Sequence, residues 1–186
     1  MAILAPTASV RRGILTACLT WTAISTRRQG LAAAANPLQH PSSIATSIAS
    51  QMSDHLKEMP PAAKLLGREI ISVDPQSGEV TLRFAAKAEF ANRHGTVQGG
   101  MLAAMLDSAT GNAVMARLPS HLTAVTTRLD TQFLKPAALG PITATARLVH
   151  QDELSAHVEA ELTDSQGRIV ATARAELRVR ERKKPA

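Results

Sequence analysis

The sequence predicts an α+β fold in which an antiparallel β-sheet wraps around one long central helix. The helix is indicated over residues 99–116, where apolar side chains recur at steps of three and four residues and no proline interrupts them. Runs that read as strands lie on both sides of this segment, with connections of hairpin length. With 186 residues, of which 45% are apolar, the chain is long enough to bury one core.

The beginning of the chain differs in composition from the rest. Residues 1–53 contain no Asp or Glu and four arginines, and they are rich in Ala, Ser and Thr, which is typical of an organellar transit peptide. The apolar run 13–24 is too short to span a membrane, and because Arg11 and Arg12 precede it, a secretory signal is also compatible. A third interpretation is that translation begins at Met52, where apolar periodicity and balanced charge both begin.

We favour the third interpretation. In each case we expect a leader over residues 1–51 that is not part of the fold, one domain over residues 52–180 and a basic tail over residues 181–186. We expect a cytoplasmic location, with a mitochondrial or other organellar location as the alternative if the leader is a genuine transit peptide.

Charge and composition argue against several classes of function. The formal net charge of +6 comes from the two ends of the chain, and residues 54–177 carry a net charge of −2. A nearly neutral folded part argues against nucleic-acid binding, and the four aromatic residues are too few to form base-stacking platforms. Because Cys18 is the only cysteine and the six histidines show no ligand spacing, we expect neither a metal site nor a cofactor.

The segment before the central helix is expected to form two short helices and a hairpin. Ser53-Asp54 can cap the first helix, and Pro61 can begin the second, which Gly67 ends. The residues between the two helices and the central helix also predict two strands, at 69–73 and 79–84, separated by five turn-forming residues. The loop into the central helix contains Phe90, which we expect to anchor it in the core.

The segment after the helix is expected to contain four strands. The first is long and half-buried, with one set of residues (Val125, Thr127, Leu129, Thr131 and Phe133) alternating with a polar set that faces outward (Thr126, Arg128, Asp130 and Gln132). Three further strands are expected at 142–149, 154–162 and 168–179, with a tight turn at 164–167.

The stretch from Asn92 to Ala116 contains the candidate catalytic and binding residues. Gly99-Gly100 begins the helix, so the first backbone N–H groups are uncovered and can approach a ligand oxygen. Asp107 lies in the middle of the apolar helix, where an acid is costly to bury unless it is paired or used. Small residues share its helix face and leave room beside it: Gly100, Ala103, Ala104 and Gly111. From spacing alone, an Asp107 that merely faces solvent is equally compatible.

This stretch resembles the signature of the hot-dog fold acyl-CoA thioesterases, in particular the phenylacetate-catabolism (PaaI-like) type. Their pattern is an Asn, a loop that ends in His-Gly-Gly, and an acid seven positions after the second glycine. Asn92, Gly99-Gly100 and Asp107 match this pattern, whereas Gln98 stands where the family usually has His. The resemblance covers roughly residues 64–180. It implies a hot-dog fold, hydrolysis of acyl-CoA thioesters to free acid and CoA, and a homodimer or homotetramer with active sites in the dimer interface.

The resemblance also implies a role for each site residue. The backbone N–H of Gly99 would stabilise an oxyanion, because its donor is fixed in place before the charge develops. Asp107 would act as nucleophile or general base, Asn92 of another subunit would hold the carbonyl or the lytic water, and the hydroxyl of Thr126 would orient water. Three further residues are expected to bind substrate: Gln98, Gly100 and His94.

Alternatives remain beside these assignments. Asn92 can be a turn former, Gln98 and His94 exposed loop residues, and Thr126 an ordinary strand residue. A hot-dog dehydratase or hydratase would use His94 with Asp107, and a non-catalytic acyl-CoA-binding protein would have a site left incomplete by Gln98. The spacing from Gly-Gly to Asp fits the thioesterases better than either alternative. We expect no nucleic-acid partner and no stable membrane span.

Overall fold

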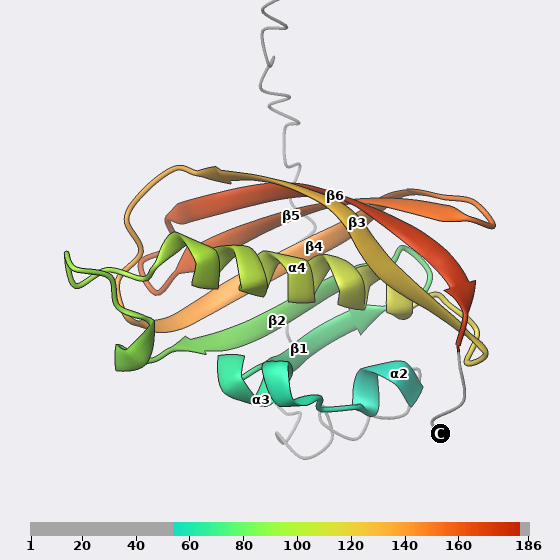
Figure 1. Ribbon diagram of the computed structural model, residues 1–186, viewed down its shortest axis with the longest axis horizontal. Coiled ribbons are helices and arrows are strands. Elements are labelled where there is room, and N and C mark those ends of the chain that lie inside the picture. The colour runs from blue at the N-terminus through green and yellow to red at the C-terminus, as the bar shows by residue number, and fades with distance from the viewer. Residues whose placement is uncertain (1–53, 183–186) are drawn as a thin grey trace, which may run out of the picture. The chain divides into compact units, whose positions relative to one another are not determined.

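The computed structural model describes residues 54–182, so the expectations for residues 1–51 and 183–186 lie outside the described part of the chain. Figure 1 shows the elements with their labels. In chain order they are α2 (Asp54–Lys57), α3 (Pro61–Leu66), β1 (Glu69–Asp74), β2 (Glu79–Ala86), the short 3₁₀ helix η1 (Ala88–Phe90), α4 (Gly99–Met115), β3 (Leu122–Phe133), β4 (Gly140–Gln151), β5 (Ser155–Asp164) and β6 (Ile169–Glu181).

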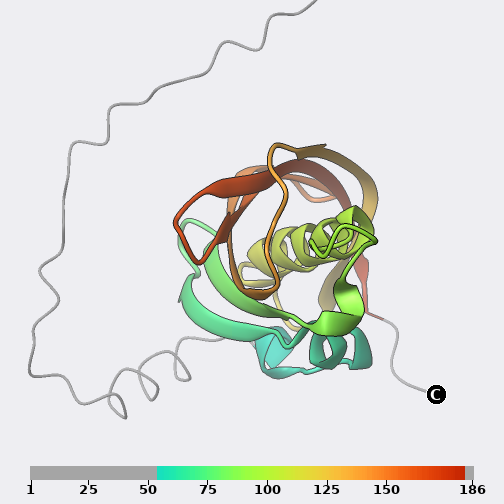
Figure 2. The same ribbon diagram turned by 90° about the vertical axis from the view of Figure 1, so that its left-hand side faces the viewer.

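The six strands form one antiparallel sheet in the order β1-β2-β4-β5-β6-β3. The sheet curves around α4, which is seen nearly end-on in Figure 2. Helix α4 packs against β2, β3, β4, β5 and β6, and its remaining side faces the viewer in Figure 1. The predicted α+β architecture, a sheet wrapped around one long helix, is therefore confirmed.

The core between the sheet and α4 is aliphatic. Strands β2, β4, β5 and β6 bury alternate residues, and Met105, Leu106 and Ala109 of α4 are fully enclosed by them. Phe84 and Phe90 add the buried aromatic volume, with 1% and 5% exposure. The expected anchoring of the loop by Phe90 is thus confirmed, because η1 holds this ring in the core just before the loop that enters α4.

Helix α2 contacts α4, helix α3 contacts β2, and a buried arginine ties this segment to the fold. Pro61 begins α3, and Gly67 ends it in a left-handed conformation (φ 62°), as expected from its position. The guanidinium of Arg68 donates to the carbonyl of Glu58 at 2.7 Å and to Oδ1 of Asn112 in α4 at 3.3 Å. Burial lowers the pKa of Arg68, because desolvation disfavours its charge.

Strand β3 differs from the expected alternation because it contains a β-bulge between Thr126 and Arg128. Thr126 pairs with buried Leu177, so it lies on the helix side of the sheet and not on the outward face. Val125 pairs with exposed Arg178 and is itself 39% exposed. The expectation that Val125 and Thr127 share a face with Leu129, Thr131 and Phe133 was therefore wrong for the part of the strand before the bulge.

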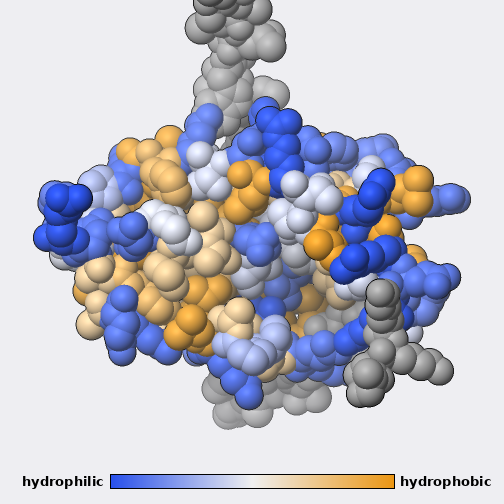
Figure 3. Space-filling model, in the orientation of Figure 1, coloured by the Kyte–Doolittle hydropathy of each residue, from blue (hydrophilic) through white to orange (hydrophobic). Residues whose placement is uncertain are grey.

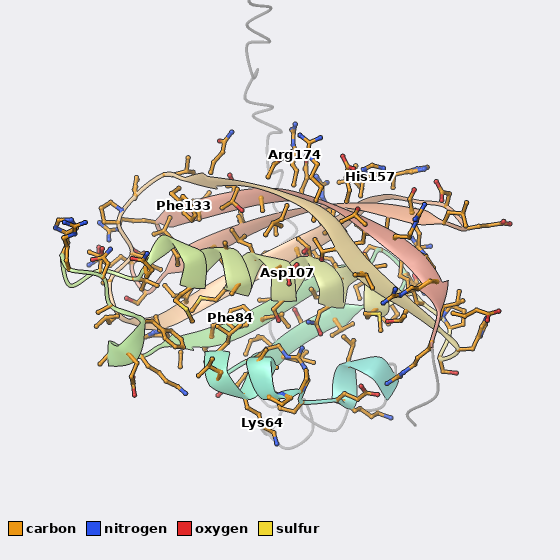
Figure 4. The ribbon with its side chains drawn as sticks, viewed as in Figure 1. Lys64, Phe84, Asp107, Phe133, His157 and Arg174 are labelled. Carbon is orange, nitrogen blue, oxygen red and sulfur yellow. The ribbon has the colours of Figure 1, made fainter. Side chains whose placement is uncertain are left out.

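The outer face of the sheet carries charged and polar side chains. Opposite charges lie next to each other across strands, where Glu159 lies 3.4 Å from Arg147 and 3.3 Å from Arg174. Within β3, Arg128 lies 3.0 Å from Asp130. His157 and Arg174 point away from α4 in Figure 4. No helix within the described residues is both long and apolar enough to cross a membrane.

Candidate active site

The site is built around the start of α4. Gln98 has extended backbone angles and its N–H donates to the carbonyl of Phe90 at 2.8 Å, which fixes where the helix begins. The N–H of Met101 donates to the carbonyl of Gln98 at 2.9 Å. Within residues 54–182, the N–H groups of Gly99 and Gly100 have no hydrogen-bond acceptor. Two uncovered donors at the positive end of a helix can bind a developing negative charge.

The loop before α4 is organised by Asn92. Its Oδ1 accepts the N–H groups of His94 at 2.8 Å and Thr96 at 3.3 Å, and its Nδ2 donates to Oγ1 of Thr96 at 2.9 Å. Gly95 has a φ of 74°, which favours glycine in this turn. Asn92 therefore forms the loop turn, and one of the two Nδ2 hydrogens remains available for another acceptor.

Asp107 lies half-way along α4, on the side that the sheet does not cover (Figure 4). Its side chain is exposed, and the carboxylate makes no hydrogen bond or ion pair with any residue in 54–182. The residues that share this face are small or partly buried, namely Gly100, Ala103, Ala104 and Gly111. Figure 3 shows apolar surface over the N-terminal half of α4 in the same orientation. The carboxylate is thus free to meet a ligand or a second protein surface.

The two candidate groups on α4 are too far apart to act on one carbonyl within one chain. Gly99 and Asp107 are eight residues apart in a continuous helix, which is about 12 Å along the axis at 1.5 Å per residue. Reacting atoms must approach to about 3–3.5 Å. The tilt of the Asp107 side chain toward the helix N-terminus shortens the gap but does not close it.

The remaining predicted residues fall into two groups. Gln98 and Gly100 lie beside Gly99. Apart from its chain neighbours and the helix's own backbone, no atom of the described residues comes within 4 Å of the position that a Cβ on Gly100 would occupy. His94 is exposed in the Asn92 loop, and its contact in the described residues is the one from its backbone N–H to Asn92. Thr126 is half-buried on the helix side of β3. The structure therefore brings Gln98, Gly99 and Gly100 together, with Asp107 farther along the same open face.

One residue beside Gly99 was not among the candidates. The ring of Phe133, at the end of β3, lies against Gly99: its Cζ would be 3.3 Å from a Cβ at that position. Figure 4 shows Phe133 over the first turns of α4. The sequence alternation placed Phe133 opposite the outward-facing residues of its strand, so the ring was expected to be buried. In the structure it is 54% exposed, which the alternation does not signal.

The comparisons with known proteins bear on this arrangement. The thioesterase superfamily model matches residues 94–171. The solved structure of a phenylacetic acid degradation-related protein from Ralstonia eutropha JMP134 is 37% identical, with a TM-score of 0.63 over 65% of this chain and 91% of that chain. The chain belongs to the thioesterase superfamily. The E. coli PaaI protein from the phenylacetic acid degradation operon is 29% identical, with a TM-score of 0.63 over 71% of this chain and 93% of that one.

A protein of Saccharolobus solfataricus named "Putative esterase" is 27% identical over 110 residues, which is 59% of this chain and 76% of that protein. Membership of the thioesterase superfamily confirms the predicted hot-dog fold and the predicted enzyme class, a thioester hydrolase. The resemblance drawn from Asn92, Gly99-Gly100 and Asp107 is confirmed at the level of the family.

Proposed function

We propose that this thioesterase hydrolyses acyl-CoA thioesters at sites shared between two subunits. The observation that carries the proposal is the pair of uncovered N–H groups at Gly99 and Gly100, on the same open face as the unpaired carboxylate of Asp107. The donors suit the oxyanion of a tetrahedral intermediate, and the carboxylate suits a nucleophile or a general base. Because about 12 Å of helix separates them, each set of donors needs a carboxylate from another chain.

In the general-base route, the thioester carbonyl oxygen binds at the N–H of Gly99, with Gly100 beside it. The partner subunit's Asp107 takes a proton from water as the water oxygen attacks the carbonyl carbon. The oxyanion then collapses, the C–S bond breaks, and the thiolate of CoA leaves with the proton that Asp107 carries. In the nucleophilic route, an Asp107 oxygen attacks the carbonyl carbon, the C–S bond breaks and CoA leaves as the thiolate. Water then hydrolyses the resulting anhydride and supplies the proton that the thiolate takes up.

The other candidates have supporting roles in this proposal. Asn92 fixes the loop that ends at Gly99, and its remaining Nδ2 hydrogen can hold the carbonyl or the lytic water. Gln98 has no side-chain hydrogen bond as the N-cap residue of α4, so its amide is available to the substrate at the position where related enzymes use His. Thr126 faces the helix side of the sheet, where its hydroxyl can orient water, and His94 is exposed at the loop for contact with substrate.

The long edge strand of the sheet supports a homodimer. Among residues 54–182, strand β3 is hydrogen-bonded only to β6, so one side of its 12-residue backbone has no partner strand there. An edge of this length is a template for pairing with another chain, whereas the opposite edge, β1, has six residues and a bulge. A second copy placed along β3 would also cover the open side of α4. We take residues 52–180 as the domain that assembles in this way, as a dimer or as a tetramer of two dimers.

The proposal is tested by free-thiol release from a panel of short, long and aromatic acyl-CoA thioesters. We expect the wild-type protein to hydrolyse members of the panel, and Asp107→Asn and Asp107→Ala to lose nearly all of this activity while they stay folded and dimeric. Glu153→Gln is the matched control, because Glu153 is an exposed carboxylate outside the site. Wild-type activity in folded, dimeric Asp107→Ala would rule out the assignment of Asp107, and no hydrolysis of any CoA thioester would rule out the substrate class.

Single-turnover hydrolysis in ¹⁸O-labelled water separates the two routes. In the nucleophilic route with water attacking the Asp107 carbonyl of the anhydride, a single turnover leaves ¹⁸O in the Asp107 carboxylate and transfers an unlabelled Asp107 oxygen to the released acid. In the general-base route, the label enters only the released acid. Mass spectrometry of the peptide that contains Asp107 reads the difference.

A further inference from the structure

Phe133 is the only exposed phenylalanine, tyrosine or tryptophan within residues 54–182. The other two, Phe84 and Phe90, are buried in the core, whereas 54% of Phe133 is accessible. Exposing a large apolar ring is unfavourable by about 25 cal/mol for each square ångström left in water. An exposed aromatic residue on a polar strand therefore calls for an explanation by something that covers it.

The ring has a defined position because its backbone is held on two sides. Phe133 pairs with Ala171, which is fully buried, so its side chain lies on the helix side of β3. The next two backbone N–H groups, of Leu134 and Lys135, donate to the carbonyl of Val170 at 2.8 and 3.2 Å. The segment that follows is bonded to the loop before α4, through the N–H of Val97 and the carbonyl of Ala137 at 2.9 Å.

The ring lies directly against the candidate oxyanion donor. Three of its carbon atoms would be within 3.3–3.5 Å of a Cβ on Gly99, so the absence of a side chain at residue 99 is what lets the ring come this close. The surroundings along α4 are apolar and partly open, with Met101 and Ala104 packed at the edge of the core. A thioester bound at Gly99 would therefore have the face or edge of Phe133 next to its carbonyl group.

We propose that Phe133 is a specificity-determining residue whose ring forms the wall against which the acyl group packs. The inference rests on the proposed acyl-CoA hydrolysis. The acyl side of the thioester fits this wall better than the pantetheine side, because pantetheine carries two amides that need hydrogen-bond partners when they are desolvated. The ring, Met101 and Ala104 offer no side-chain partner of that kind, whereas an alkyl chain needs none.

The experiment is a comparison of kcat/KM over straight-chain acyl-CoA thioesters from acetyl-CoA to octanoyl-CoA. The variants are Phe133→Ala and Phe133→Leu, with Leu154→Ala as the control, because Leu154 is 70% exposed in the connection between β4 and β5. In Phe133→Ala we expect the ratio of octanoyl-CoA to acetyl-CoA kcat/KM to fall by about tenfold or more, since each methylene that loses its apolar contact is worth about 10-fold or more. This ratio for Phe133→Leu should lie between the ratios for Phe133→Ala and wild type, and the ratio for Leu154→Ala should equal that of wild type.

A purely structural role would give a different result. If Phe133 only supports the start of α4 or a contact between subunits, its removal lowers kcat/KM equally for all chain lengths, with a change in melting temperature or in oligomeric state. That result, or an unchanged ratio in an active variant, would overturn the inference and leave the proposed function standing. Wild-type protein that hydrolyses none of the series and none of the aromatic thioesters would remove both proposals.

Discussion

Gly99 and Gly100 are chemically identical neighbours that the structure places in different surroundings. A methyl group on Gly99 would press on the ring of Phe133 at 3.3 Å, whereas one on Gly100 would meet no atom of the described chain within 4 Å. Sequence reasoning could assign both glycines to the start of the helix. It could not rank them, because the difference depends on a ring that is 34 positions away in the sequence and arrives through the pairing of β3 with β6.

We therefore predict that Gly100→Ala keeps or raises the melting temperature and loses activity. Replacing glycine by alanine in a helix stabilises it by about 0.5–1 kcal/mol, and no contact with the part of the chain that the structure describes opposes the methyl group. The methyl group would stand beside the Gly99 donor, in the space that the thioester carbonyl needs. Displacing a substrate from one oxyanion donor lowers kcat by about 10²-fold or more. A thermal melt and the thioester assay check this, and full activity would show that Gly100 does not border the substrate.

Three aspartates close the hairpin turns of the sheet, and each is an acceptor of nearby hydrogen bonds. Oxygens of Asp74 accept the Ser77 hydroxyl at 2.6 Å and the Gln76 N–H at 2.9 Å, and those of Asp152 accept the N–H groups of Leu154 and Ser155 at 2.8 and 2.7 Å. Asp164 accepts the N–H and the guanidinium of Arg168. These bonds favour the ionised carboxylates and lower the pKa of each of the three.

The lowered pKa values predict how stability depends on pH. An aspartate whose pKa is lower in the folded state stabilises the fold fully above its unfolded pKa of about 3.9, and this contribution is lost as the pH falls through the folded pKa. We expect the free energy of unfolding to be level near neutral pH and to fall below about pH 4. Urea titrations at several pH values measure it. In the triple variant Asp74→Asn, Asp152→Asn, Asp164→Asn, the free energy of unfolding should fall less as the pH is lowered. If it falls as much as in the wild-type protein, other titrating groups cause the acid dependence.

The N-terminal boundary of the fold depends on whether α2 contributes to its stability. Leu56 is 2% exposed, and Glu58 is held by two arginines: Arg68 donates to its carbonyl and Arg182 pairs with its carboxylate. We predict that a variant beginning at Met52 has the melting temperature and activity of the full chain, because the leader lacks the patterning needed to pack. For a variant beginning at Pro60, the free energy of unfolding should be lower by about 2–4 kcal/mol, because the buried Leu56 and one or two hydrogen bonds are removed.

Thermal and urea unfolding of the three proteins separate these expectations. A large drop for the variant that begins at Met52 would mean that the leader contributes to the fold. No drop for the variant that begins at Pro60 would mean that α2 is only loosely attached, despite the contacts of Leu56 and Glu58.

At the scale of elements, the sequence predicted what depends on local chemistry. The helix that contains Asp107, the start of α3 at Pro61 and its end at Gly67 agree with the structure, because caps, glycines and apolar period act over a few residues. The predicted face of Thr126 was wrong, because a bulge shifts the alternation of a strand by one residue and leaves no local signal in the sequence. The place of β3 beside β6 was also beyond prediction, since it depends on long-range pairing.

At the scale of the whole molecule, we expect the candidate site to be incomplete in one chain. The donors of Gly99 and Gly100 and the carboxylate of Asp107 lie on one helix but about 12 Å apart, and the unpaired edge of β3 borders the same open side. The family resemblance implied both the residues and a site shared between subunits, whereas the linear motif by itself carries no information about which chain completes which site. That depends on how two copies pack.

Mixed dimers test this arrangement directly. Asn92→Ala damages the loop that ends at Gly99, and Asp107→Ala removes the carboxylate farther along α4, so each homodimer has two defective sites and should be inactive. If each site combines the Asn92 loop of one subunit with the partner's Asp107, a heterodimer of the two variants has one site with both lesions and one with none. We expect mixing and exchange to restore up to about half of the wild-type activity per heterodimer, since one of two sites is intact.

Differently tagged subunits purified through both tags give the heterodimer for the thioester assay. Its control is an Asp107→Ala homodimer whose two subunits carry the two different tags; prepared in the same way, it should remain inactive. Restored activity cannot come from a site within one chain, because every chain in the mixture carries a lesion in its own loop or its own carboxylate. A heterodimer that forms and stays inactive would therefore mean that Asn92 and Asp107 of the same chain serve one site, in spite of the length of helix between Gly99 and Asp107, or that another pair of residues does the chemistry.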